Sequence, residues 1–69
     1  MNLEIGDLVY NKLLPNLCFL IIDVYTFGYN WRDYKTFCPY TNTFQEYSKS
    51  WFIERLEKEN TEWVLQKKK

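Results

Sequence analysis

The chain has no histidine, and its 69 residues include only two cysteines, two glycines and two prolines. Without histidine, neither a Ser–His nor a Cys–His nucleophile pair can form, and a zinc site of the Cys/His type is not supported. A glycine-rich phosphate-binding loop is also missing, and the nine carboxylates are spread singly along the chain. We therefore expect a protein that is not an enzyme, with no catalytic residues, no metal site and no cofactor.

Long hydrophobic runs are missing as well. The longest, residues 17–22, is far too short to cross a bilayer, and residues 1–4 lack the features of a signal peptide. We therefore expect no membrane partner and a cytoplasmic location with reduced thiols. Cys18 and Cys38 are then expected to be small buried core residues, with a disulfide between them as the alternative.

Charge of one sign is not in excess, because nine basic residues balance nine acidic ones. Three of the basic residues are the terminal Lys67, Lys68 and Lys69, so the remaining body carries six basic and nine acidic residues. A negatively charged body repels phosphate, which disfavours nucleic-acid binding. We expect residues 1–66 to form a single domain and residues 67–69 to be a disordered basic tail that aids solubility.

Aromatic residues, in contrast, are abundant at 20% of the chain. A domain of this length buries only roughly 60% of the surface that its unfolded chain exposes. One small core is therefore unable to hold all the aromatic side chains. Some of them are expected at the surface, where they favour binding.

Segments rich in Val, Ile, Tyr and Phe alternate with turn signals and predict a small all-β domain. The five expected strands span residues 8–13, 17–26, 33–40, 43–47 and 61–66. Alternation along the second strand predicts two opposite faces, with Cys18, Leu20, Ile22 and Val24 on one and Phe19, Ile21, Asp23 and Tyr25 on the other. The first face is expected to be the inner one, so Ile22 is predicted to lie in the core.

Residues 49–56 break this period of two, because three large apolar residues follow one another there. The segment predicts a short 3₁₀ turn that closes the domain before the last strand. Its inward side chains are expected to be Trp51, Ile53 and Leu56. The alternative is an α-helix over residues 48–65, where charged residues recur at i, i+4 spacing.

The two ends of the chain carry the motifs Ile5-Gly6-Asp7-Leu8-Val9 and Trp51 followed by Leu56-Glu57. These motifs resemble the small SH3-like β-barrel proteins encoded by tailed bacteriophages, which typically open with Gly-Asp-Leu-Val and close with a tryptophan and a Leu-Glu pair. The resemblance covers residues 5–58 and implies a five-stranded SH3-like barrel in the host cytoplasm or the virion. One departure is the turn at Thr41-Asn42, where Gly is usual, although Asn tolerates positive φ. Such barrels serve as adaptors, nucleic-acid binders and virion parts alike.

Four aromatic residues recur at every second position around a predicted turn, and Gly28 and Asn30 there can adopt positive φ. A period of two places such residues on one side of a strand-like segment. Tyr and Trp dominate the hot spots of protein interfaces. We therefore predict a protein-binding surface formed by Tyr25, Phe27, Tyr29, Trp31 and Arg32. The alternative is that two of the four aromatic residues cap the core.

These features favour a protein–protein interaction module, and a phage-encoded factor that binds a host or virion protein is one form of it. The alternative is a nucleic-acid-binding small barrel, in which aromatic side chains stack on bases. Only Arg32 and Lys35 flank the aromatic segment, so the basic residues that a nucleic-acid binder needs are scarce. Two further alternatives are a structural virion component and a groove for a Pro-rich peptide or a methylated lysine.

Overall fold

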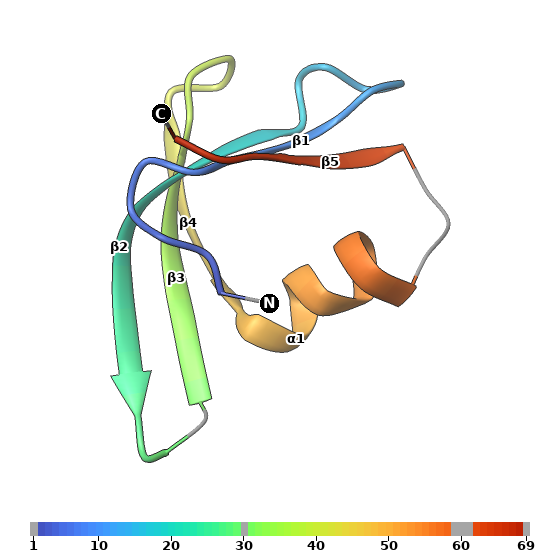
Figure 1. The fold of residues 1–69 in the computed structure, drawn as a ribbon. Coiled ribbons are helices and arrows are strands. Elements are labelled where there is room, and N and C mark those ends of the chain that lie inside the picture. The colour runs from blue at the N-terminus through green and yellow to red at the C-terminus, as the bar shows by residue number, and fades with distance from the viewer. Residues whose placement is uncertain (1, 30, 59–61, 69) are drawn as a thin grey trace.

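Five antiparallel strands form one sheet in the computed structural model, which describes residues 2–29, 31–58 and 62–68 (Figure 1). The strands are β1 (Leu8–Asn11), β2 (Cys18–Phe27), β3 (Trp31–Cys38), β4 (Thr43–Ser48) and β5 (Trp63–Gln66). Their order across the sheet is β4-β3-β2-β1-β5. The predicted all-β class with five strands is therefore confirmed.

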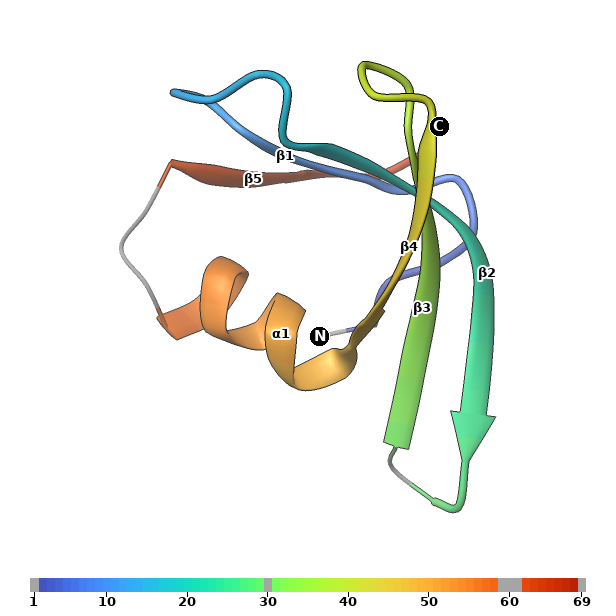
Figure 2. The ribbon, with the colours of Figure 1, turned by 180° about the vertical axis from the view of Figure 1, so that it is seen from behind.

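The two edges of this sheet, β4 and β5, do not pair with each other in the described part of the chain. A helical segment lies between them instead, consisting of α1 (Lys49–Ile53) and the π-helical η1 (Glu54–Lys58) (Figures 1 and 2). α1 packs against β3 and β4, whereas η1 packs against β5. The sheet is therefore not closed into a barrel by strand pairing, and a helical segment joins its two edges at the place where a short turn was predicted to close the domain.

The segment predicted as a 3₁₀ turn is an α-helix that continues as one turn of π-helix. Its N-terminus is capped by Ser48, whose hydroxyl accepts a hydrogen bond from the N–H of Trp51 at 3.3 Å. The 3₁₀ prediction is therefore wrong, because the segment forms α-helix and then π-helix. The alternative of one α-helix over residues 48–65 is also wrong, because β5 begins at Trp63.

Phe52 is the helical residue that enters the core. It is fully buried and lies edge-to-face with Tyr34, with ring centroids 5.3 Å apart. Trp51 and Leu56 pack against the core as predicted, but Ile53 is only half-buried and lies outside that packing. Residues at i, i+4 share a face in an α-helix, whereas a 3₁₀ turn aligns i with i+3, so the wrong helix type led to the wrong inward residue.

The core contains Leu3, Val9, Ile21, Tyr34 and Phe52, all fully buried. The prediction that Ile22 lies in the core is wrong, because Ile21 is fully buried and Ile22 is only half-buried. The pairing of β2 with β3 shifts between Ile21 and Asp23, which is a β-bulge. The bulge reverses the alternation, so Ile21 points inward before it and Val24 packs against the core after it.

The last described residues are held against the start of the chain. The carboxylate of Asp7, which is fully buried, accepts hydrogen bonds from Lys67 Nζ at 2.7 Å, the Glu4 N–H at 2.8 Å and the Lys68 N–H at 3.1 Å. Burial raises the pKa of Asp7, but these hydrogen bonds and the charge of Lys67 outweigh it and lower the pKa below its usual range. The expectation of a disordered tail is therefore corrected for Lys67 and Lys68, and Lys69 lies outside the described residues.

Cys18 and Cys38 are both buried and both free, so the prediction that they are core residues is confirmed and the disulfide alternative is wrong. Cys38 points to the same side of β3 as the buried Tyr34 and Thr36. Within the ranges that the structure describes, no helix has the length and apolar character needed to cross a lipid bilayer.

Candidate functional site

The predicted protein-binding residues lie at the end of the long hairpin formed by β2 and β3, which projects beyond the helical segment (Figure 1). Strand pairing continues to the last residues of the hairpin, where Phe27 lies directly opposite Trp31. The sequence predicted that Trp31 and Arg32 lie in a loop. The structure instead places both residues in β3. Gly28 has the predicted positive φ of 61°, which lets the chain turn tightly, whereas Asn30 lies outside the described residues.

The register of the hairpin sorts the predicted residues onto two faces. Val24 pairs with the buried Tyr34, so Thr26 and its partner Arg32 lie on the same, inner face. The intervening residues lie on the outer face and include three of the predicted set: Tyr25, Phe27 and Trp31. The structure thus brings these three together, places Tyr29 in the turn and separates Arg32 from them.

Three of these aromatic side chains are exposed to solvent. The exposed fraction is 53% for Phe27, 102% for Tyr29 and 47% for Trp31, and we call these residues the hairpin-tip aromatics. Tyr25 is half-buried. The hairpin-tip aromatics therefore do not cap the core, and they form an apolar surface on a projecting element.

Charged residues follow the hairpin-tip aromatics along the outer face. Lys35 of β3 lies between Asp23 of β2 and Glu46 of β4 in the register of the sheet. Burial raises the pKa of the Tyr25 hydroxyl, and the nearby charges of Asp23 and Glu46 raise it further. This part of the outer face therefore carries two carboxylates and one ammonium group.

Beyond this charged row, Phe37 and Phe44 form a second aromatic pair, with ring centroids 5.0 Å apart. Phe44 is 61% exposed, and Lys35 Nζ lies 5.5 Å from the centroid of its ring. The outer face of β2, β3 and β4 thus has aromatic residues at both ends and charged residues between them.

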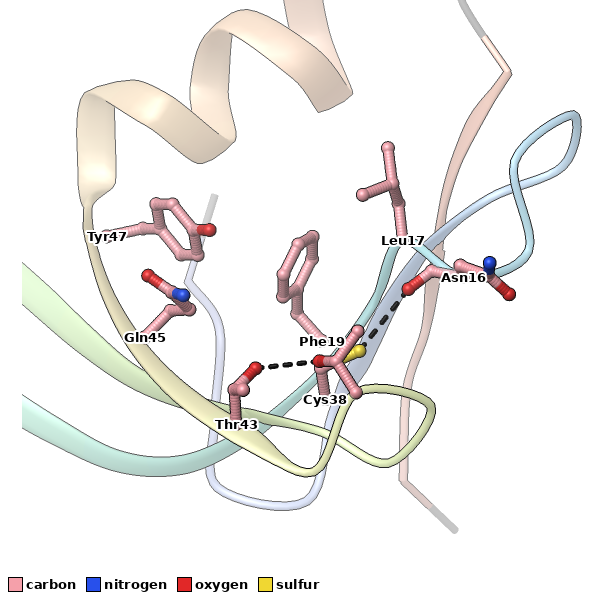
Figure 3. Close-up of a pocket in the computed structure, with 8 residues that line it drawn as sticks. Asn16, Leu17, Phe19, Cys38, Thr43, Gln45 and Tyr47 are labelled. Carbon is pink, nitrogen blue, oxygen red and sulfur yellow. Dashed lines mark hydrogen bonds between the residues drawn. The ribbon is translucent and has the colours of Figure 1, made fainter.

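A pocket of about 330 Å³ opens on the inner side of the sheet, beside the edge strand β4 (Figure 3). It is lined by Asn16, Leu17, Phe19, Cys38, Thr41, Thr43, Gln45 and Tyr47. Phe19 projects into it from β2, between Leu17 on one side and Tyr47 on the other. None of the lining residues is charged, so the pocket suits an apolar group. The sequence did not predict this pocket, because strand pairing assembles it from residues 16–19 and residues 38–47, which are far apart in the chain.

The thiol of Cys38 lines this pocket and donates a hydrogen bond to the carbonyl of Asn16 at 3.3 Å. Burial raises the pKa of Cys38, but hydrogen bonds from the Thr41 hydroxyl and from the N–H groups of Thr41, Tyr40 and Cys18 outweigh it and lower the pKa. Burial raises the pKa of Cys18, as does the charge of Cys38. The part of the chain that the structure describes has no group of three or more His, Cys, Asp and Glu residues arranged to hold a metal ion.

Trp51 lies near the pocket but offers no free ring face. Tyr47 stacks on it at a centroid distance of 4.0 Å, and the guanidinium of Arg55 lies over the same ring at 3.9 Å. Both faces of the indole are therefore covered from within the chain. This arrangement argues against Trp51 as the cation-binding ring of a methylated-lysine groove.

Comparison of the chain with protein-family models, with curated protein sequences and with solved structures gives no match.

Proposed function

We propose that this protein is a non-enzymatic protein–protein interaction module that binds its partner through the hairpin tip. The observation that supports this proposal is the exposure of three large aromatic side chains, Phe27, Tyr29 and Trp31, on a projecting hairpin. Exposed aromatic side chains on a defined backbone are typical of interface hot spots, because they lose little conformational entropy when they become buried. The sequence resemblance suggests a phage-encoded factor in the host cytoplasm as one form of this module.

The charges around the hairpin favour a protein over a nucleic acid as the partner. Among the described residues of β2, β3 and β4, the outer face carries Asp23, Asp33 and Glu46 but only one cation, Lys35. Arg32 lies on the opposite face of the hairpin, and Lys67 is paired with Asp7. Phosphate would meet a repulsive surface beside the rings on which bases would have to stack.

The test is an affinity capture with the full chain, tagged at the N-terminus, from a lysate of the cells in which the protein is made. The captured protein is then purified and titrated with the wild type, with Trp31→Ala and with Tyr40→Ala. Tyr40 is the matched control, because it is an aromatic residue that is 63% exposed in the turn between β3 and β4, at the other end of those strands.

Trp31→Ala is expected to weaken binding by about tenfold or more, as truncation of a hot spot does. Tyr40→Ala should leave the affinity unchanged, and both variants should keep the melting temperature of the wild type. Equal binding by wild type and Trp31→Ala would contradict the proposal. Tight, steeply salt-dependent binding of single-stranded oligonucleotides would favour the nucleic-acid alternative.

A further inference from the structure

Asp33 lies on the outer face directly beside the hairpin-tip aromatics. Its strand neighbour on that face is Trp31, two residues away, and its partner across the hairpin is Tyr25. Two residues along a strand span about 6.6 Å. A carboxylate and an indole ring are therefore presented side by side, with a phenol ring opposite.

The carboxylate of Asp33 has no partner among the described residues. Its Oδ1 atom is buried and accepts no hydrogen bond from the residues that the structure describes. A carboxylate oxygen that is withdrawn from water without a hydrogen-bond donor is unfavourable. A binding partner that supplies a donor would remove this cost.

Three of the described cations make contacts with residues other than Asp33. Lys35 lies between Asp23 and Glu46 and over the ring of Phe44, and Arg32 lies on the opposite face of the hairpin. Arg55 covers Trp51 and donates a hydrogen bond to its carbonyl at 3.2 Å. None of these three cations is paired with Asp33 in the part of the chain that the structure describes.

We propose that the partner presents an arginine flanked by apolar side chains, with its guanidinium against the carboxylate of Asp33 and the ring of Trp31. This inference rests on the proposed function, because it assigns the partner chemistry of the same surface. A guanidinium is planar, donates two parallel hydrogen bonds to a carboxylate and stacks on aromatic rings. Its flanking apolar groups would contact Phe27, at the end of β2, and Tyr29, in the turn, both of which are exposed.

The test uses the full chain and three acetylated, amidated tripeptides as probes: Leu-Arg-Leu, Leu-Gln-Leu and Leu-Glu-Leu. Binding is followed by ¹H–¹⁵N correlation spectra. Leu-Arg-Leu is expected to shift the amide signals of Tyr25 and Asp33 and the indole signal of Trp31, with a Kd on the order of 1 mM. The neutral and acidic peptides should bind about tenfold more weakly, because neither provides a charged donor.

Two variants with nearly unchanged shape locate the contact. Asp33→Asn should raise the Kd for Leu-Arg-Leu by about tenfold. Asp23→Asn is the matched control on the same face, since one oxygen of Asp23 already accepts the Val24 N–H at 2.8 Å. Its Kd should change by less than about threefold, because Asp23 lies farther from Trp31 along the hairpin than Asp33 does.

Equal binding of the three peptides, or no shift with any of them, would overturn the inference, and neither result depends on whether a variant folds. Wild-type affinity of Asp33→Asn would also overturn it. Shifts at the same signals on dilution of the free protein would assign the face to a second copy, and shifts with an oligonucleotide would assign it to nucleic acid. If Trp31→Ala loses the captured protein while Asp33→Asn retains it, the proposed function stands and the arginine inference fails.

Discussion

Lys67 donates a hydrogen bond to the buried carboxylate of Asp7 at 2.7 Å, across 60 residues of sequence. The pair joins the residue after β5 to the turn before β1, so it fastens the edge strand to the rest of the sheet. Asp7 is fully buried, whereas half of the Lys67 side chain is exposed. The carboxylate therefore depends on its donors more than the ammonium depends on its acceptor.

Asp7→Asn should destabilise the fold by roughly 1.5–3 kcal/mol, because it replaces hydrogen bonds to a charged group with weaker ones in a buried site. Urea unfolding measures the change in the free energy of unfolding. Lys12→Gln is the control, since Lys12 is exposed and distant from this pair. An Asp7→Asn variant as stable as the control would show that the buried carboxylate contributes nothing.

Acid should weaken this contact in a predictable window. The pKa of Asp7 is lower in the fold than in the unfolded chain, so its contribution is complete above the unfolded value of about 3.9 and is lost as the pH falls through the folded value. The free energy of unfolding should therefore decrease below about pH 4. Asp7→Asn should show a shallower decrease over that window, and an unchanged slope would contradict the assignment.

The β-bulge predicts unequal effects at two adjacent isoleucines of β2. Ile21→Ala should cost about 2–5 kcal/mol, because it leaves a cavity in a fully buried site. Ile22→Ala should cost clearly less, since Ile22 is half-buried. Thermal unfolding of the two variants tests the assignment, and a larger loss at Ile22 would restore the simple alternation.

The two cysteines should differ in reactivity. Cys38 lines the pocket and has a lowered pKa, whereas the pKa of Cys18 is raised. The thiolate is the reactive form, so iodoacetamide should alkylate Cys38 first in the folded protein, as peptide mass spectrometry would show. In urea the two should react at similar rates, and faster alkylation of Cys18 in the folded state would contradict the hydrogen-bond arrangement around Cys38.

Much of the β2–β3 hairpin and of the turn between β3 and β4 was predictable from the sequence. The glycine at position 28 and the asparagine at position 42 both adopt positive φ, as their residue types had suggested for tight turns. The aromatic residues at positions 25, 27 and 31 share a face, as their spacing predicted. Their exposure did not follow from spacing, because the same pattern also fits a cap on the core.

The sequence by itself determined the five strands, their turns and the aromatic composition of the hairpin, because alternation and turn propensity act between near neighbours in the chain. Tertiary structure alone decided four features: the inward position of Ile21, the open sheet, the Asp7–Lys67 pair and the pocket beside β4. Each of these depends on contacts between segments far apart in sequence. A one-residue bulge also reverses which side chains of the strand point inward beyond it, and the alternation of residues in the sequence does not reveal this reversal.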